Sequence, residues 1–127
     1  MSIFVLDASA LMAVIRREPG APFVEARMSG ARMSAVNASE AVMRSVEKGF
    51  CEDLVIALIA AERLVLVPFD AGLAIATARL RSVTHHLGLS FADRACIATA
   101  IAIGGTIITA DRVWATLDLG CKIELIR

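Results

Sequence analysis

Short, largely apolar runs alternate with longer helix-like segments along this chain, and this alternation limits the folds open to it. The runs occupy 3–6, 33–36, 64–67, 106–109 and 121–126. Short apolar runs are typical of strands that are buried on both faces of a parallel sheet. Strands that alternate with helices predict an α/β domain built around a mainly parallel sheet of about five strands.

The segments between these runs have helical character. We expect helices over 8–17, 22–28, 37–48, 52–62, 71–87, 90–103 and 111–117. The chain has 127 residues, which is close to the length of one domain at roughly 150 residues per domain. Because no repeat or linker interrupts the pattern, residues 1–127 are predicted to form a single domain.

Composition excludes several classes of protein. Hydrophobic residues make up 57% of the chain and charged residues 20%, which excludes an intrinsically disordered chain. The uncharged run 95–110 contains two adjacent glycines and is shorter than the roughly 20 apolar residues of a bilayer span. No basic segment precedes an apolar stretch at the N-terminus, so no secretory signal is evident. We therefore expect a cytoplasmic protein without a membrane segment.

Cysteines and charges add two further expectations. Cys51, Cys96 and Cys121 lie far apart and form no Cys-x-x-Cys pair, which is typical of reduced thiols in a reducing compartment. Thirteen basic residues balance thirteen acidic ones, whereas a protein that coats nucleic acid carries an excess of basic residues. Any contact with nucleic acid is therefore expected to be local.

Four acidic residues are expected to meet at one edge of the predicted sheet. Asp7 directly follows the first run, and Asp111 follows the fourth run after one intervening residue. Glu40 and Asp93 lie in the first turns of the helices expected over 37–48 and 90–103. Because parallel strands share one carboxyl edge, where ligands of α/β domains bind, the sequence predicts a common site there.

Each acid also has a purely structural interpretation. The segments 37–40 and 90–93 resemble capping boxes, in which an acid returns a hydrogen bond to the start of its helix. Asp7 and Asp111 are suitable N-caps, and Asp70, which also follows a strand, is interpreted as a cap alone. A non-catalytic α/β binding module with capping acids therefore remains an alternative.

Four carboxylates in one crevice repel one another, so they would bind protons or require a cation. Oxygen ligands without a nearby His or Cys suit a hard ion, Mg²⁺ or Mn²⁺. Such ions accompany phosphate chemistry in enzymes. The residue types therefore favour metal-assisted chemistry on phosphates or phosphodiesters.

Four sequence blocks surround these acids and carry a resemblance to a known family. They are 6–11 (LDASAL), 34–40 (SAVNASE), 88–96 (GLSFADRAC) and 109–114 (TADRVW). In this order they resemble the PIN-domain ribonucleases, and most closely the VapC-type toxins of type II toxin–antitoxin systems. The resemblance extends over essentially the whole chain. Trp114 stands where another aromatic residue is usual and Ala92 replaces a frequent Gly, and neither change removes a functional group.

The resemblance implies a PIN-like α/β/α sandwich and a Mg²⁺- or Mn²⁺-dependent endoribonuclease. In the implied mechanism, a metal-activated water attacks the scissile phosphate in line and the 3′ oxygen departs. The implied catalytic residues are Asp7, Glu40, Asp93 and Asp111.

The resemblance also implies roles for individual residues and partners. Asp7 and Asp93 are expected as direct metal ligands, and it remains open whether Glu40 and Asp111 act through a water. Ser9 and Thr109 match hydroxyl positions that support the site by hydrogen bonding. The implied partners, listed together, are an RNA substrate, a cognate antitoxin protein and a second copy of the chain in a homodimer.

Two further features each have two interpretations. Arg94 and Arg112 each follow one of the acids and are candidates for RNA phosphate contacts, with surface salt bridges as the alternative. The apolar stretch 54–61 is richer in apolar residues than one face of a surface helix needs. It predicts either core burial or a contact surface for another subunit or an antitoxin helix.

Overall fold

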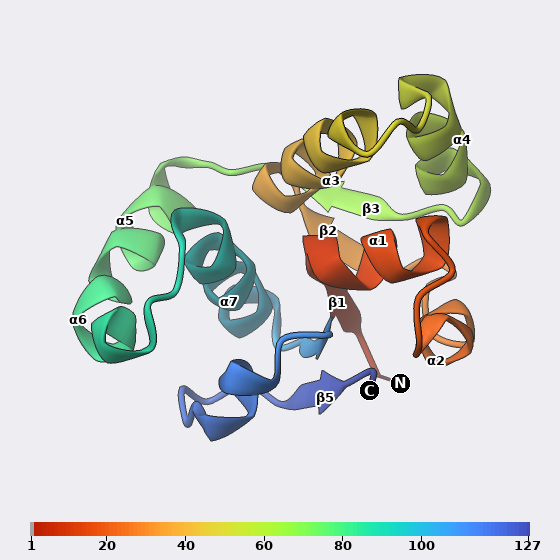
Figure 1. The fold of residues 1–127 in the computed structure, drawn as a ribbon. Helices are drawn as coiled ribbons and strands as arrows, with labels where there is room; N and C mark the ends of the chain where they lie inside the picture. Colours follow the sequence, from red (N-terminus) through yellow and green to blue (C-terminus); the bar gives the residue numbers. More distant parts are fainter. Residues whose placement is uncertain (1) are drawn as a thin grey trace.

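The computed structural model describes residues 2–127 and contains a five-stranded parallel sheet (Figure 1). The strands are β1 (Phe4–Leu6), β2 (Arg32–Ser34), β3 (Val65–Val67), β4 (Thr106–Thr109) and β5 (Ile123–Leu125). They lie in the order β3-β2-β1-β4-β5, and every neighbouring pair is parallel. The predicted α/β class, with a parallel sheet of about five strands, is confirmed.

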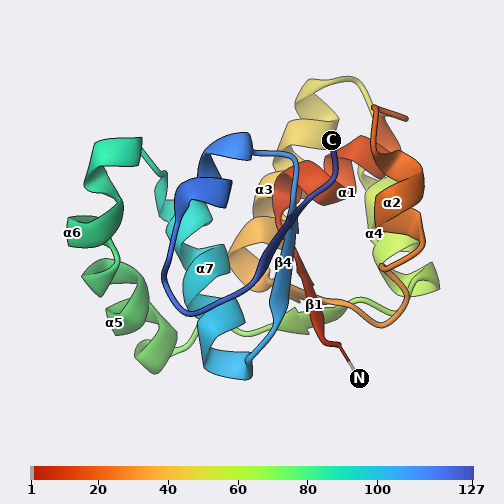
Figure 2. The ribbon, with the colours of Figure 1, turned by 90° about the horizontal axis from the view of Figure 1, so that it is seen from below.

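Helices cover both faces of the sheet and complete an α/β/α sandwich (Figure 2). One face carries α1 (Ala8–Ile15), α2 (Ala21–Glu25) and α4 (Glu52–Ala61). On the other side α7 (Phe91–Ile103) lies against the sheet, with α5 (Ala71–Arg79) and α6 (Arg81–Thr84) outside it. The remaining long helix, α3 (Ala35–Glu47), contacts both α1 and α7 and so joins the two layers.

The two central strands alternate their side chains between two apolar cores. Val5 pairs with Ile107, and both pack with the buried Trp114 on the α7 side. Leu6 pairs with Ile108, and both pack on the side of α1 and α2. Because successive strand residues point to opposite faces, short apolar runs fill both cores at once.

The helix expected over 71–87 is divided into three parts. It consists of α5, α6 and a short 3-10 helix, η1 (His85–Leu87). Residues Ser82, Val83 and Thr84 lose side-chain freedom in a helix or compete for its backbone hydrogen bonds. The Thr84 hydroxyl donates to the Leu80 carbonyl oxygen at 2.7 Å. The expectation of one continuous helix was therefore wrong.

The helix expected from residue 37 starts two residues earlier, at Ala35. Ser34 ends β2 and caps α3, because its Oγ accepts a hydrogen bond from the Val36 N–H at 3.2 Å. Glu40 therefore lies in the second turn of α3, and the capping box predicted for 37–40 is absent. The helix expected over 111–117 is also different, since it is a 3-10 helix, η2 (Arg112–Thr116).

Gly105 lies where the chain enters β4 beside β1. A Cβ atom at this position would come within 2.6 Å of Val5 Cγ2 and 3.3 Å of the Ile3 carbonyl oxygen. The absence of a side chain therefore allows the two central strands to approach. Within residues 2–127, no helix is long and apolar enough to span a bilayer.

Candidate active site

The four predicted acids line one cavity of about 220 Å³ beyond the carboxyl ends of β1 and β4. Its lining residues come from four separate parts of the chain: Asp7, Ala8, Ser9, Asn37, Glu40, Arg44, Ser90, Asp93 and Asp111. The structure thus brings Asp7, Glu40, Asp93 and Asp111 together at the expected edge of the sheet. We call this cavity the acidic pocket.

Asp7 is the most deeply buried of these acids, and three donors hold its carboxylate. The Ser9 hydroxyl donates to Oδ1 at 2.6 Å, and the Ala10 N–H donates to the same oxygen at 2.9 Å. The Thr109 hydroxyl donates to Oδ2 at 2.6 Å. Asp7 is therefore the N-cap of α1, and Ser9 and Thr109 make the contacts that the resemblance implies for them.

Burial raises the pKa of Asp7 to about 6 because the charged form is poorly solvated there. Hydrogen bonds from Ser9, Thr109 and Ala10 lower this pKa, while the nearby negative charge of Asp93 raises it. Asp7 is thus mainly an anion at neutral pH, although it is buried beside other acids. A bound cation would relieve this unfavourable electrostatic environment.

Asp93 and Asp111 each use one carboxylate oxygen as a cap. Asp93 Oδ2 accepts from the Ser90 N–H at 2.9 Å, and Ser90 Oγ accepts from the Asp93 N–H at 3.1 Å, so the predicted capping box is present. Asp111 Oδ1 accepts from the Val113 N–H at 3.0 Å. Each cap occupies a single oxygen, which leaves the second oxygen of the carboxylate for another ligand.

Glu40 pairs with a cation instead of capping a helix. Its Oε1 lies 2.9 Å from Nη2 of Arg44, one turn further along α3. Arg44 lines the acidic pocket as well, although it was not among the residues predicted for the site. The signal was available, since an acid and a base four residues apart on a helix face each other.

Asn37 is a second residue of the acidic pocket that was not among the predicted site residues. Its side chain is buried, with 1% exposure, and its Nδ2 donates to the Ala92 carbonyl oxygen at 3.0 Å. This bond ties α3 to the first turn of α7. Its Oδ1 is a buried acceptor for which residues 2–127 supply no donor, and such an atom favours an additional ligand.

The family model of the PIN domain matches residues 4–119. The chain belongs to the PIN domain family. No curated protein matches its sequence. Among solved structures, this PIN domain is similar to DNA-bound VapBC from Salmonella typhimurium, with 21% identity, 100% of each chain covered and a TM-score of 0.75.

Two further solved structures share the fold of this PIN domain. VapC20 from Mycobacterium tuberculosis, named as a Sarcin-Ricin loop cleaving toxin, is 14% identical with a TM-score of 0.77, over 94% of this chain and 98% of its own. A toxin–antitoxin complex from Klebsiella pneumoniae is 15% identical with a TM-score of 0.76, over 97% of each chain.

The two arginines predicted to contact phosphates do not line the acidic pocket of the PIN domain. Arg94 Nη1 donates to the Thr77 carbonyl oxygen at 3.3 Å, and its guanidinium lies 5.9 Å from the centre of the Phe91 ring. Arg112 Nε donates to the Arg127 carbonyl oxygen at 3.2 Å. Among residues 2–127, neither arginine forms the salt bridge that was the alternative.

Asp70 lies outside the acidic pocket and caps a helix, as its interpretation required. It is the N-cap of α5, and its Oδ1 accepts from the Leu73 N–H at 2.9 Å. Asp70 therefore provides a matched comparison for the acids of the pocket.

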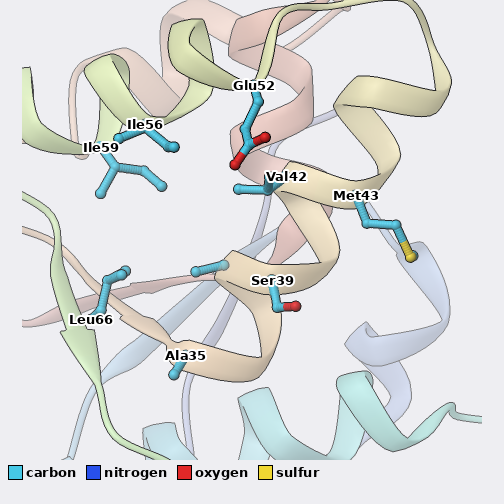
Figure 3. Close-up of a pocket in the computed structure, with 9 residues that line it drawn as sticks. Ala35, Ser39, Val42, Met43, Glu52, Ile56, Ile59 and Leu66 are labelled. Carbon is cyan, nitrogen blue, oxygen red and sulfur yellow. The ribbon is translucent and has the colours of Figure 1, made fainter.

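The apolar stretch 54–61 forms most of α4, and core burial accounts for part of it, since Leu58 and Ile59 pack against the core beside Val55. Val55 is the buried residue of the helix, whereas Leu54 and Ile56 are 51% and 49% exposed. Ile56, with Leu66 of β3, helps to line an apolar groove of about 540 Å³ between α3, α4 and β3 (Figure 3). Core burial therefore explains the face that carries Val55, and the contact-surface interpretation fits the exposed residues Leu54 and Ile56.

The lining of the acidic pocket provides hard oxygen donors of the kind that a divalent cation binds. Its ionisable lining includes carboxylates and no His or Cys, and the amide oxygen of Asn37 is a further hard donor. Within residues 2–127, no three His, Cys, Asp or Glu side chains converge closely enough to enclose a metal ion. Mg²⁺ needs only one or two carboxylates because it retains several waters. The donors therefore fit a partly hydrated hard ion.

Proposed function

We propose that this PIN domain is a Mg²⁺- or Mn²⁺-dependent endoribonuclease and the toxin of a toxin–antitoxin pair. The observation that carries the proposal is the acidic pocket, where three acids from distant parts of the chain surround a buried, anionic Asp7. Capping alone would not require the four acids to share one cavity. A hard cation beside phosphate is the chemistry that such a pocket favours.

Asp7 and Asp93 would hold the cation directly, with Glu40 and Asp111 contributing through water. The chemistry that such an ion supplies when bound is activation of a water and neutralisation of charge on the phosphate. Ser9 and Thr109 keep the Asp7 carboxylate ionised and oriented through their hydrogen bonds. Glu40 would accept a hydrogen bond from the attacking water and orient it in line with the leaving 3′ oxygen.

The proposal includes protein partners in the cytoplasm. The similar solved structures named above include toxin–antitoxin complexes, and the apolar groove between α3, α4 and β3 supports a protein partner of this kind. An antitoxin helix in the toxin–antitoxin complex and a second copy in a homodimer are the partners that we propose.

A non-catalytic binding module is the second candidate, because Asp7, Asp93 and Asp111 do serve as helix caps. The two candidates differ in what a cation does. Caps of a binding module need no metal, so Mn²⁺ would not stabilise such a protein. A nuclease with the acidic pocket would gain stability from Mn²⁺ and would cut RNA.

Cleavage of total RNA tests the proposal. The purified protein is incubated with Mg²⁺ or Mn²⁺, with and without a chelator, and the new RNA ends are mapped. We expect discrete ends from the wild type, none with chelator, and none from Asp7→Asn. The matched control Asp70→Asn alters a cap outside the pocket and should cleave like the wild type. Cleavage by folded Asp7→Asn at the wild-type rate would contradict the proposal.

A further inference from the structure

A second polar cavity, of about 200 Å³, carries a concentration of positive charge. Arg16, Arg44, Lys48 and Arg127 line it, together with a single acid, Glu18. The chain as a whole has no net charge, so this grouping of four bases with one acid is a local feature. We call this cavity the basic pocket.

The basic pocket adjoins the acidic pocket. Ser9 and Arg44 line both cavities, so the two cavities are separated by no more than these side chains. Ser9 donates to the carboxylate of Asp7, the central acid of the acidic pocket. The positively charged side chains of the basic pocket therefore lie near Asp7, the acid on which the proposed reaction depends.

Two packed helices provide the walls of the basic pocket. On α3, Arg44 and the C-cap residue Lys48 follow Glu40 at intervals of four residues, so the three side chains form one row. On α1, Ser9 is followed after seven residues by the C-cap residue Arg16, which returns to the same face after two turns. At 1.5 Å per residue, seven residues rise roughly 10 Å, about the axial length of three stacked nucleotides.

The floor of the basic pocket is fixed by a contact between the same two helices. Met12 lines the pocket, and the Ser45 hydroxyl of α3 lies 3.1 Å from its Sδ. At the far end, Arg127 Nη1 donates to the Pro19 carbonyl oxygen at 2.8 Å. The guanidinium of Arg127 is thereby held at the pocket and not left to move freely.

Favourable interaction with helix dipoles explains only part of this charge. Arg16 and Lys48 are the C-caps of α1 and α3, where cations are favoured. That explanation does not extend to Arg127, which lies beyond β5 and in no helix. Glu18, 3.6 Å from Arg16, and Glu40, 2.9 Å from Arg44, balance two of the four charges. Lys48 and Arg127 therefore leave a net positive charge for an anion.

We propose that the basic pocket binds the sugar-phosphate backbone of the RNA substrate on one side of the bond that is cut. This inference rests on the proposed function and adds the direction in which the strand leaves the acidic pocket. Arginine guanidinium groups match phosphate oxygens with two parallel hydrogen bonds, and lysine adds a point charge. Because such contacts read the backbone, the pocket would raise affinity without selecting a base.

A double charge-neutralising variant tests the inference. Arg16→Gln with Lys48→Gln removes two exposed cations that line the basic pocket and not the acidic one. The matched control is Arg81→Gln with Lys122→Gln, which removes two exposed cations that line neither cavity. Both variants change the net charge equally, so any difference between them in RNA binding or cleavage reflects where the removed cations lie.

Steady-state cleavage and RNA binding are both measured. In the test variant we expect the KM for RNA to rise on the order of tenfold with kcat unchanged, because two phosphate contacts are lost. Binding of a fluorescein-labelled oligouridylate in chelator is followed by anisotropy at several salt concentrations. The slope of log K against log salt should fall by about 1.4, roughly 0.7 for each lost contact on a single strand. The control should match the wild type in both measurements.

Failure of the inference and failure of the proposed function give different results. If the wild type cleaves RNA but the test variant keeps the KM and salt slope of the control, the basic pocket does not bind the strand. If kcat falls while KM stays constant, the inference is likewise overturned. If the wild type cleaves no RNA, the proposed function fails, and the anisotropy slopes still decide whether the basic pocket binds the backbone.

Discussion

The Thr109 hydroxyl donates a 2.6 Å hydrogen bond to Asp7 Oδ2, although the two residues lie 102 positions apart in the sequence. They meet because β1 and β4 are adjacent and parallel, with Leu6 paired to Ile108. Asp7 and Thr109 each follow one member of that pair. The register of the central strands therefore places the donor beside the buried acid.

Thr109→Val tests this relationship with little change of shape. Without the hydroxyl, the buried Asp7 carboxylate loses a donor, which should destabilise the protein by about 1–3 kcal/mol at pH 7. The pKa of Asp7 should rise further, since a hydrogen bond to its charged form is lost. Urea unfolding at pH 7 and pH 4.5 measures the effect, and we expect a larger loss at pH 7.

Thr99→Val is the control for that experiment. Thr99 is also fully buried, but its hydroxyl donates to the Ala95 carbonyl oxygen of its own helix at 2.8 Å. No ionisable group takes part in this contact, so the loss of stability should not vary with pH. Equal losses for the two variants at both pH values would show that the Thr109 hydroxyl does not stabilise a charge.

The raised pKa of Asp7 predicts how stability varies with pH in the presence of a chelator. The folded protein keeps the proton up to a pH of about 6, whereas the unfolded chain releases it near 3.8, the ordinary value. The proton on Asp7 therefore stabilises the folded state fully below about pH 3.8, and this stabilisation is lost as pH rises through about 6. Each pKa unit is worth 1.36 kcal/mol, so the loss is at most about 3 kcal/mol.

Asp7→Asn removes this titration. Its free energy of unfolding, measured with urea from pH 4 to 7, should decline less than that of the wild type, by up to the same about 3 kcal/mol. The stability of the variant relative to the wild type should therefore be higher at pH 7 than at pH 4, despite its loss of RNA cleavage. Parallel curves for the two proteins would mean that Asp7 titrates at its ordinary pKa.

Much of the fold could be predicted from the sequence because the apolar runs are too short for helices and are separated by helical segments. Helix boundaries were less accessible. Ser34 and Asn37 are both good N-caps, and the end of β2 at Ser34 decides between them. The break in segment 71–87 could not be predicted, because apolar residues continue through it. The Thr84 hydroxyl, which competes for backbone hydrogen bonds of the helix, acts only on the neighbouring turn.

The acidic pocket was predictable because topology alone brings the ends of parallel strands together. The positions of the nearby cations were not predictable, since they depend on how helices face each other. Arg94 follows Asp93 in the sequence, but consecutive side chains of a helix point in directions about 100° apart. The Arg94 side chain therefore contacts Thr77 of α5 and not the acidic pocket. The spacing of Glu40 and Arg44 signals their ion pair, but only the packing of α1 against α3 places Arg44 and Lys48 beside Ser9.

Asp93→Asn should abolish stabilisation by Mn²⁺. If the wild type binds the ion in the acidic pocket, saturation at 100 times the Kd adds about 2.7 kcal/mol to its stability. A thermal-shift titration with Mn²⁺, reversed by chelator, measures this gain. Asp70→Asn also replaces a capping acid and should retain the full Mn²⁺ response. An equal response in both variants would exclude Asp93 as a ligand.

Gly105→Ala should destabilise the fold, and Gly72→Ala should not. The added methyl at 105 would meet Val5 Cγ2 at 2.6 Å, and overpacking of this kind costs about 1–3 kcal/mol. At 72, within α5, the nearest atom is Asp70 Oδ1 at an ordinary 3.5 Å, so alanine should stabilise by roughly 0.4–1 kcal/mol. Urea unfolding followed by the fluorescence of the single tryptophan, Trp114, compares them.

Arg44 should have opposite effects on the two ligands of the site. Its ion pair with Glu40 competes with any cation for that carboxylate, so Arg44→Gln should tighten Mn²⁺ binding. The gain should stay below about fivefold, because Arg44 is exposed and ion pairs with solvent-exposed members are worth about 0–1 kcal/mol. Arg44 also lines the basic pocket, so the same variant should raise the KM for RNA. Arg16 lines the basic pocket and not the acidic one. Arg16→Gln should therefore raise the KM for RNA without changing the midpoint of the Mn²⁺ titration. An unchanged midpoint in Arg44→Gln would mean that the cation lies out of reach of Glu40.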